Sequence, residues 1–325
     1  MKKGTFVTAT ATATALTLAL TLGMAGIGAL AKTDKIPEPT YQDVTIATVD
    51  DKGESFDLKT NVYLPKKKGN SEPTPLVLFI HGNGGTYNFP NGSRSYDLSI
   101  ALADRGIAVA TIDYRPKAGL PEDVYDVKAY VRYFKANAEK YNIDPEKVAV
   151  WGTSRGGNLA SLLAATGDDP KLEGDVGGNL DQSSKIHSAV IYYPFTDAFF
   201  YDDPSGILKN FYGAQDSDIA GILAANESND TSSPYWPFVE KIRLVNPINH
   251  VDKEDPPVLI TIGGQDPVTP IKHSTELFNK YLEHGVDASL YAWAPGVHGR
   301  VGTDIEAATA EWLVNKLLGE QSEEK

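Results

Sequence analysis

The sequence predicts an α/β fold with a mostly parallel central sheet and helices on both of its faces. Short apolar runs of strand length alternate with runs of helix length over most of the chain, which is typical of a parallel sheet. The run at residues 148–151 contains no polar side chain, as expected of a strand buried on both faces. A glycine-bounded turn and a helix-forming segment follow it directly. The chain of 325 residues is long enough for one large α/β domain, and it contains no internal repeat.

The first 31 residues have the three parts of a secretory signal peptide. A basic start, Met1 to Lys3, precedes an uncharged apolar stretch at residues 12–25, and Ala29 and Ala31 form a small-residue cleavage site. We expect cleavage after Ala31, which leaves an α/β domain at residues 32–319 and a polar tail at 320–325. The alternative is an uncleaved membrane anchor, although the apolar stretch is short and diluted by threonine and glycine.

The composition limits the partners of the chain. It contains no cysteine, which excludes disulfides and a lipoprotein anchor and suits a bacterial exporter. The net charge of −13 disfavours nucleic acid and anionic membrane surfaces as partners. We expect a secreted protein, either released or retained at the cell surface, with no stable membrane insertion after signal cleavage. No metal or cofactor is implied, since neither an H-E-x-x-H motif nor a cysteine ligand occurs.

The expected strands and helices follow one another in a regular order. Two strands at residues 45–49 and 58–64, separated by a short polar turn, form an edge hairpin. Further strands are expected at residues 75–80, 107–112, 148–151, 186–193, 257–262 and 288–293. Helices are expected at residues 95–105, 121–141, 158–165, 272–284 and 305–318. The helix at 121–141 is the longest, and its apolar residues recur at helical spacing.

Residues 195–250 interrupt this alternation. The segment has no clean period, is rich in aromatic residues and leaves the sheet between two expected strands. We interpret it as a cap over the site; the alternative is an ordinary excursion that packs a small core of its own. In the cap interpretation its aromatic rings wall a substrate pocket, and Tyr235 and Trp236 are the candidate substrate contacts.

Residues 152–156 read G-T-S-R-G and match the motif G-x-S-x-G. Because the chain contains 29 glycines, the match alone is weak. The strand expected before the motif and the helix expected after it support a catalytic role for its serine. A sharp strand-to-helix turn holds a serine hydroxyl above the sheet. Ser154 is therefore the candidate nucleophile, and the N-terminus of the following helix directs free N–H groups at the reacting centre.

A glycine-rich loop, H-G-N-G-G at residues 81–85, follows the strand expected at 75–80. In an acyl-transfer enzyme, backbone N–H groups of such a loop hold the oxyanion together with the residue after the nucleophile, so the candidate donors are Asn83, Gly84 and Arg155. The alternative is a phosphate-binding glycine loop. It is disfavoured because Tyr87 occupies the position of the last glycine in the dinucleotide motif, and no P-loop motif occurs.

A histidine and an acid are needed beside the serine, and this architecture places them in the order serine, acid, histidine. Among six histidines, His298 lies in the loop between the last strand and the last helix, at the sheet edge where open α/β sheets place their sites. Asp266 follows the strand at 257–262 at the same edge and is the candidate acid. Its rivals are Asp197, which follows the preceding strand, and Asp255, which belongs at the opposite edge.

Together these motifs make the chain similar to the α/β-hydrolase superfamily. It most resembles the serine esterase branch that groups bacterial feruloyl and acetyl-xylan esterase-like domains with hormone-sensitive-lipase-type esterases. The matching segments are LFIHGNGG at 78–85, DYR at 113–115, PEDVYDV at 121–127, WGTSRGGNLA at 151–160, YPFTD at 193–197, GQDPVTP at 264–270, and His298. The resemblance implies an α/β-hydrolase domain at residues 32–319, with a cap-like insertion at about 195–250 and a triad of Ser154, Asp266 and His298.

Two positions depart from the family pattern. Its H-G-G-G loop reads H-G-N-G here, and Arg155 stands where many members have alanine. Both are compatible with the expected chemistry because the oxyanion donor is a backbone N–H. The Arg155 side chain is either a substrate contact or a partner in a buried ion pair. The resemblance assigns Arg115 and Asp126 to a structural ion pair rather than to catalysis.

The sequence therefore predicts a secreted serine esterase that cleaves short-chain acyl esters or phenolic and carbohydrate esters through an acyl-enzyme. One alternative is a serine peptidase related to prolyl oligopeptidases, although those usually carry a large N-terminal domain and only residues 32–74 precede the first core strand. The other alternative is a non-catalytic binding protein on the same fold. Such proteins typically lose a triad member, whereas all three are present here.

Overall fold

The central sheet is built from strands whose side chains are largely buried. The computed structural model describes residues 37–66, 72–88 and 94–319, so the expected signal peptide and the polar tail lie outside the described part of the chain. Every residue of the third strand is buried, because helices cover both faces of the sheet. The strands are β1 (Tyr41–Asp51), β2 (Glu54–Tyr63), β3 (Thr74–Ile80), β4 (Ala108–Ile112), β5 (Ile143–Thr153), β6 (Ser188–Tyr192), β7 (Val258–Gly263) and β8 (Ala288–Trp293).

The strands lie in the order β1-β2-β4-β3-β5-β6-β7-β8. β1 and β2 form the expected antiparallel edge hairpin, and β2 pairs antiparallel with β4. The remaining neighbours pair in parallel; in the middle of the sheet, Leu78 of β3 is paired with Ala110 of β4 and with Val150 of β5. The carboxyl ends of β3 to β8 therefore share one edge of the sheet, where open α/β sheets place their sites.

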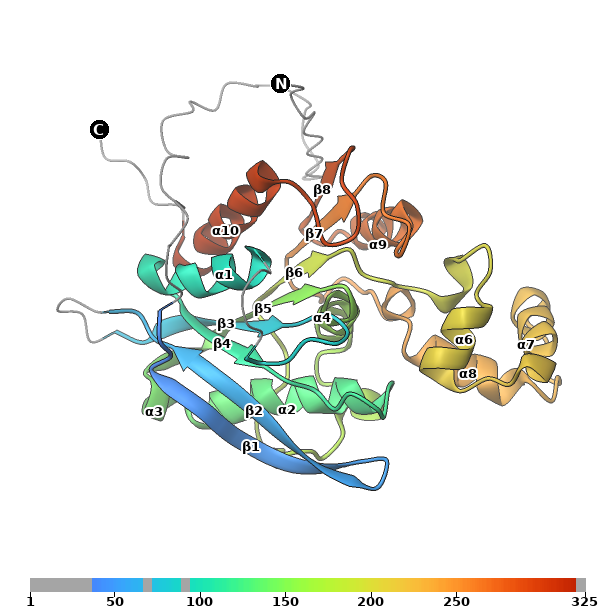
Figure 1. Cartoon of the computed structure of the whole chain (residues 1–325), viewed down its shortest axis with the longest axis horizontal. Helices are drawn as coiled ribbons and strands as arrows, with labels where there is room; N and C mark the ends of the chain where they lie inside the picture. Colours follow the sequence, from blue (N-terminus) through green and yellow to red (C-terminus); the bar gives the residue numbers. More distant parts are fainter. Residues whose placement is uncertain (1–36, 67–71, 89–93, 320–325) are drawn as a thin grey trace.

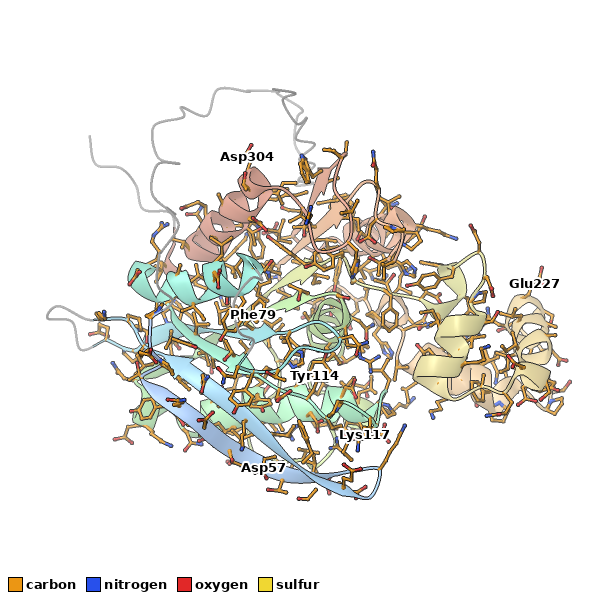
Figure 2. All side chains as sticks on the ribbon, in the orientation of Figure 1. Asp57, Phe79, Tyr114, Lys117, Glu227 and Asp304 are labelled. Carbon is orange, nitrogen blue, oxygen red and sulfur yellow. The ribbon has the colours of Figure 1, made fainter. Side chains whose placement is uncertain are left out.

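Helices cover both faces of the sheet (Figure 1). On one face, α2, α4 and α9 bury Val127, Leu159 and Leu277 in a large core, and on the other face α1 and α10 bury Leu98 and Leu313. The rings of Phe79 and Tyr114, labelled in Figure 2, belong to these two opposite cores. The helices that flank the sheet are α1 (Arg94–Ala101), η1 (Leu102–Arg105), α2 (Glu122–Ala136), α3 (Ala138–Tyr141), α4 (Arg155–Thr166), α5 (Pro170–Glu173), α9 (Ile271–Glu283) and α10 (Thr303–Leu318).

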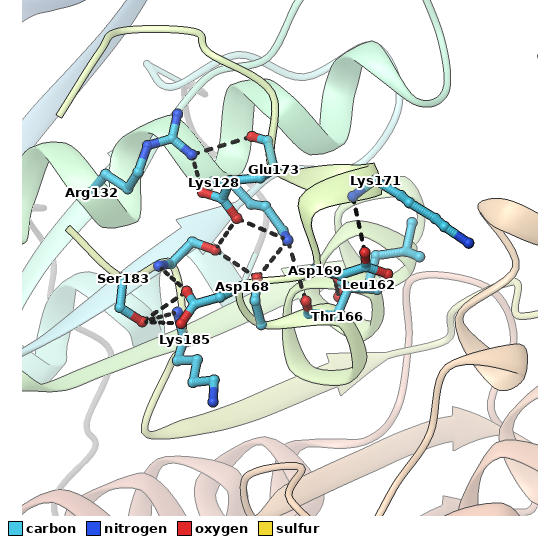
Figure 3. A network of polar contacts seen from close by, with 12 residues as sticks. Lys128, Arg132, Leu162, Thr166, Asp168, Asp169, Lys171, Glu173, Ser183 and Lys185 are labelled. Carbon is cyan, nitrogen blue, oxygen red and sulfur yellow. Dashed lines mark hydrogen bonds and ion pairs between the residues drawn. The ribbon is translucent and has the colours of Figure 1, made fainter. Parts of the chain in front are cut away.

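Charged side chains of α2 hold the segment that follows α4 (Figure 3). Lys128 and Arg132 are both fully buried, and both form ion pairs with Glu173 at the end of α5. The ammonium of Lys128 also donates to the carbonyl of Gly167 at 2.5 Å. Removing one partner would leave a charge buried without compensation, so this network fixes the segment after α4 on the surface of α2.

Residues 195–250, here called the helical insertion, are helical rather than irregular. They contain η2 (Ala198–Phe200), α6 (Ser205–Tyr212), α7 (Asp216–Ser228), α8 (Trp236–Leu244) and η3 (Pro247–Asn249). The sequence shows no clean period here and no helix was expected, because these helices are short and carry little periodicity; α7 buries only Ile222 and Ala225. The insertion lies beyond the carboxyl ends of the central strands, at the right of Figure 1.

The two ends of the helical insertion are held together by one side chain. The carbonyl oxygen of the Asn246 amide accepts a hydrogen bond from the N–H of Ala198 at 3.3 Å, and its NH₂ group donates to the carboxylate of Asp197 at 2.7 Å. Asn246 is fully buried, so these hydrogen bonds satisfy a polar group that has no access to water. The chain therefore leaves the sheet and returns to it through two adjacent segments joined at Asp197, Ala198 and Asn246, here called the closed neck.

The start of α4 approaches three strands so closely that only glycine fits there. A Cβ on Gly156 would lie 2.1 Å from the carbonyl oxygen of Ile80, and a Cβ on Gly157 would lie 2.4 Å from that of Tyr192. A Cβ on Gly152 would lie 1.9 Å from the carbonyl oxygen of Gly156. These neighbours are backbone atoms that cannot rotate away, so the motif glycines are required by the packing of α4 against β3, β5 and β6.

This contact predicts the effect of adding one methyl group. We expect Gly156→Ala to lower the free energy of unfolding by about 1–3 kcal/mol or more, because the new Cβ collides with the end of β3. Gly206→Ala in α6 is the matched control: a Cβ there meets nothing within 4 Å, and alanine favours helix. Urea unfolding measures both changes. Equal midpoints for the two variants would contradict the assigned role of Gly156.

Candidate active site

Ser154 occupies a sharp turn between β5 and α4. Its backbone has φ 56° and ψ −115°, a conformation that side-chain-bearing residues rarely adopt. Its N–H donates to the carbonyl of Tyr192 at 2.9 Å, and its own carbonyl accepts from Asn158 in the first turn of α4. Backbone hydrogen bonds to the neighbouring strand and to the helix thus stabilise this strained conformation. The turn lies at the carboxyl edge of the sheet, where the sequence predicts it.

The structure brings Ser154, His298 and Asp266 into one hydrogen-bonded chain. Nε2 of His298 lies 2.9 Å from Oγ of Ser154, and Nδ1 of His298 lies 2.8 Å from Oδ2 of Asp266. When Nδ1–H donates to the carboxylate, Nε2 is left free to accept the serine proton. The His298 side chain is 23% exposed and that of Asp266 is 0% exposed. The series of hydrogen bonds therefore runs from the protein interior to an accessible hydroxyl.

Hydrogen bonds keep the buried carboxylate of Asp266 ionised. Burial alone would raise the pKa of Asp266, but the hydrogen bond from His298 and those from the Thr269 and Val268 N–H groups outweigh it and lower the pKa. The two N–H groups donate to Oδ1 at 3.0 and 2.8 Å. An acid held in its charged form can orient the imidazole and stabilise its protonated state.

Two further residues adjoin His298 and were not found from the sequence. The hydroxyl of Thr269 lies 3.0 Å from Oδ2 of Asp266 and 3.2 Å from the carbonyl of Tyr193. The ring of Tyr193 meets the imidazole edge to face, with centroids 4.8 Å apart. Tyr193 also has a positive φ of 37°. The available signals were the threonine three residues after Asp266 and the position of Tyr193 at the end of the strand expected at 186–193.

The glycine loop lies beside the serine. A Cβ on Gly82 would be 3.3 Å from Cβ of Ser154, so the loop backbone approaches the nucleophile closely. Gly84 has φ +75°, which suits glycine, and it closes a turn in which the N–H of Gly85 donates to the carbonyl of Gly82 at 3.0 Å. Asn83 and Gly84, two of the predicted oxyanion donors, form the exposed tip of this turn.

The third predicted donor, Arg155, is the first residue of α4, and its side chain is buried. It forms an ion pair with Asp123 in the first turn of α2, which identifies it as a buried pair partner rather than an exposed substrate contact. Arg115 and Asp126 form the ion pair that the resemblance implies, with Nη2 and Oδ1 2.6 Å apart. Both arginines therefore connect α2 to its surroundings.

The rival acids lie in other hydrogen-bonded environments. Asp197 caps the start of η2 and accepts hydrogen bonds from Phe199 and Asn246. Asp255 accepts from the N–H of Asp252 in the turn before β7, at the opposite edge of the sheet. Among these three carboxylates, the hydrogen bond to His298 is made by Asp266.

Tyr235 and Trp236 make their ring contacts inside the helical insertion. The Tyr235 ring fills the space beside Gly221, where an added Cβ would lie 2.0 Å from Cε2. The guanidinium of Arg243 lies 4.9 Å from the centroid of the Trp236 ring. The first contact places the Tyr235 ring against α7, and the second lies within α8, so the expected contact of both rings with substrate stays a prediction.

His273 on α9 joins the helical insertion to the Asp266 side of the site. Its Nδ1 accepts a hydrogen bond from the N–H of Thr196 at 3.0 Å, and the side chain is fully buried. Burial, together with the neighbouring positive charge of Lys272, lowers the pKa of His273 to about 4. The imidazole is therefore neutral in the folded protein near neutral pH.

Two further findings concern metal binding and membrane spanning. Within residues 37–66, 72–88 and 94–319, no group of three or more His, Cys, Asp or Glu side chains could hold a metal ion. Across the same ranges, no helix combines the length and the apolar character needed to cross a membrane.

Comparison with known proteins identifies the family. Residues 60–281, more than half of the chain, match the protein family BD-FAE. The chain belongs to the BD-FAE family. The matched residues include Ser154 and Asp266 and end before His298. The sequence-based resemblance to α/β-hydrolase serine esterases is therefore confirmed at the level of the family.

Relatives of this BD-FAE chain include a named esterase and a protein named for quorum quenching. It is 27% identical over 240 residues to esterase LipC from Mycobacterium tuberculosis, a match that covers 72% of this chain and 55% of LipC. It is 29% identical over 311 residues to the quorum-quenching protein AidA from Acinetobacter baumannii, covering 82% of this chain and 95% of AidA. The chain spans about half the length of the mycobacterial esterases that it matches.

A solved structure supports the fold. A truncated form of a carbohydrate esterase from gut microbiota is 25% identical, with a TM-score of 0.63 over 86% of this chain and 96% of that protein. Together with the observed strand order, this likeness confirms the α/β-hydrolase fold that the sequence predicts.

The buried His273 predicts a pH-dependent loss of stability. Between about pH 6.5 and pH 4, the unfolded chain binds a proton at this histidine and the folded protein does not, so stability falls as the pH drops through this window. The loss is at most about 3 kcal/mol. We expect His273→Asn, whose amide oxygen can still accept from Thr196, to remove this component. Denaturant unfolding at a series of pH values measures it.

The exposed His284 at the end of the same helix provides the control for this experiment. We expect His284→Asn to leave the pH dependence of stability as in the wild type. Parallel pH courses for His273→Asn and the wild type would contradict the role of His273.

Proposed function

We propose that this protein is a serine hydrolase that cleaves carboxylic esters. The observation that carries the proposal is the continuous hydrogen-bonded chain from Ser154 Oγ through His298 to Asp266, at 2.9 and 2.8 Å. These distances are within the range in which a base accepts the proton of a nucleophile and an acid orients the base. The names of its relatives, esterases and a carbohydrate esterase, support the same reaction.

In the proposed mechanism Ser154 attacks the ester carbonyl while Nε2 of His298 takes the hydroxyl proton. His298 then gives this proton to the leaving alcohol, and the acyl group stays bound to Ser154 as an ester. A water molecule, deprotonated by His298, attacks the acyl-enzyme and releases the acid. Asp266 keeps the proton of His298 on Nδ1 and stabilises the imidazolium that forms in each step.

The negative charge that develops on the carbonyl oxygen needs donors on the side opposite His298. The proposed donors are the backbone N–H groups of Asn83, Gly84 and Arg155. Arg155 offers its N–H at the N-terminus of α4, where the helix dipole also favours negative charge. The close approach of Gly82 to Ser154 supports the position of the glycine loop at this oxygen.

We further propose short-chain acyl esters or phenolic and carbohydrate esters as substrates of an exported enzyme. Five large hydrophobic side chains are exposed in the described part of the chain, and three of them, Val268, Ile271 and Val297, lie in the segments next to Asp266 and His298. They offer a small apolar rim on the histidine side of the serine. The likeness to a carbohydrate esterase supports the same choice. Export rests on the signal-like residues 1–31.

The hydrogen-bonded chain predicts the effect of three substitutions. We expect Ser154→Ala and His298→Ala each to lower kcat by about 10⁴-fold or more, and Asp266→Asn by about 10⁴-fold, because the three residues act as a unit. Hydrolysis of para-nitrophenyl acetate and butyrate measures all three variants against the wild type. If Asp266→Asn kept near-normal activity, the acid would be reassigned and Asp197 tested next.

The substrate proposal predicts a preference for small or aromatic esters. We expect acetyl to butyryl esters and cinnamoyl esters of sugars to be cleaved far faster than emulsified long-chain triglycerides. Tyr235→Ala or Trp236→Ala should change the value of kcat/KM for these esters. Ser154 should still react with a small phosphonylating probe in both variants. Trp312→Ala on α10, which packs on the opposite face of the sheet, is the control. Efficient triglyceride turnover, or indifference to both aromatic substitutions, would argue against this pocket.

A further inference from the structure

A buried ion pair joins the residue after Ser154 to the first turn of α2. Nε of Arg155 donates to Oδ2 of Asp123 at 2.9 Å, and Nη2 of Arg155 donates to the same oxygen. Asp123 is 1% exposed and Arg155 is 5% exposed. The second oxygen of Asp123 is buried and makes no hydrogen bond within the described residues, so the hydrogen bonds of this carboxylate all come from Arg155. The side chain of Arg155 is therefore held by α2, while its backbone begins α4.

The glycine loop is fastened to the same part of the chain. Nε2 of His81 lies 3.0 Å from Oδ1 of Asp113, and the ring of Tyr114 stacks on the imidazole with centroids 4.5 Å apart. The hydroxyl of Tyr114 also donates to the carbonyl of His81 at 3.2 Å. Asp113 and Tyr114 begin the connection that runs from β4 to α2, and Asp123 lies at its other end. One segment, residues 113–123, which comprises this connection and the start of α2, therefore contacts both sides of the proposed oxyanion hole.

We propose that Asp123 is a positioning residue of the oxyanion hole and acts through the side chain of Arg155. The proposal rests on the proposed function, since a hole is needed only if Ser154 forms a tetrahedral adduct. The N–H groups of the oxyanion hole come from two separate parts of the chain, and they must converge on one oxygen. By holding the first residue of α4 on the connection that also holds His81, Asp123 fixes the distance between the two sets of donors.

A second ion pair on the same helix provides a matched control. Asp126 lies one turn further along α2 and pairs with Arg115, and this carboxylate is also fully buried. Arg115 continues to the carbonyl of Asp50 in the edge hairpin, away from α4. Replacing Asp126 therefore removes a buried ion pair of the same kind from α2 without releasing a donor of the hole. A purely structural effect of Asp123 should resemble the effect of Asp126.

The test compares Asp123→Asn, Asp123→Glu and Asp126→Asn in the full chain. A fluorophosphonate probe first counts the reactive Ser154 in each preparation, and kcat for para-nitrophenyl acetate is expressed per reactive site. We expect Asp123→Asn to lower this kcat by about 10- to 100-fold with KM changed by less than about 3-fold, because the donors act on the transition state. The affinity of an alkyl trifluoromethyl ketone, whose adduct with Ser154 carries an oxyanion, should fall by a similar factor.

The other two variants separate positioning from folding. Asp123→Glu keeps the charge and moves the carboxylate by one methylene, so we expect a kcat between those of Asp123→Asn and the wild type. Asp126→Asn should lower the stability and leave kcat per reactive site unchanged. The inference is overturned if Asp123→Asn and Asp123→Glu keep wild-type kcat and ketone affinity per site, or if Asp126→Asn shows the same loss. If Asp123→Asn does not fold, the outcome of Asp123→Glu decides.

Failure of the proposed function gives a different result. In that case the wild type does not hydrolyse the nitrophenyl ester, or Ser154→Ala hydrolyses it equally well. The inference about Asp123 fails on its own when the wild type is active, Ser154→Ala is inactive, and the substitutions at Asp123 leave the per-site constants unchanged.

Discussion

The close contact between α4 and the strands beneath it is the constraint on which the site depends. The backbone of α4 touches carbonyl oxygens of β3 and β6 at Gly156 and Gly157, and this proximity leaves only a sharp turn between β5 and the helix. Ser154 must adopt a strained conformation in that turn, and its hydroxyl is raised above the sheet edge. The same contact brings the start of α4 next to the loop that follows β3. One steric requirement therefore determines both the exposure of the hydroxyl and the position of the N–H groups around it.

Hydrogen bonds to the buried carboxylate of Asp266 are the second feature on which the site depends. The Asp266 carboxylate is buried and accepts hydrogen bonds from two N–H groups and from His298, so its charge is satisfied on several sides. It lies in the protein interior, whereas Ser154 lies at the accessible end of the chain of hydrogen bonds. Exposure thus increases along this series of hydrogen bonds, from the buried carboxylate of Asp266 to the partly exposed imidazole of His298 and the hydroxyl of Ser154.

Much of the fold and of the candidate site could be predicted from the sequence, because both depend on local patterns. Apolar runs indicated the buried strands, and the loops after β5, β7 and β8 placed Ser154, Asp266 and His298 at a common edge. Side-chain contacts outside these motifs could not be predicted. The partner of Arg155 lies 32 residues before it, and Thr269 gains its place beside Tyr193 through tertiary packing. The helices of the insertion were missed because short helices that bury few residues leave a weak periodic signal.

The closed neck of the helical insertion has a consequence for how this protein can change over evolution. Asn246 joins the two ends of the insertion at Asp197 and Ala198. The insertion is therefore a loop whose two ends are held together next to the sheet. The entropic cost of closing a loop grows only slowly with length, by about 0.6 kcal/mol for each doubling. Helices can therefore be lengthened, lost or exchanged beyond the neck with little effect on the geometry at the carboxyl edge. The architecture therefore separates the residues at the carboxyl edge of the sheet from a helical insertion whose length and helices can vary.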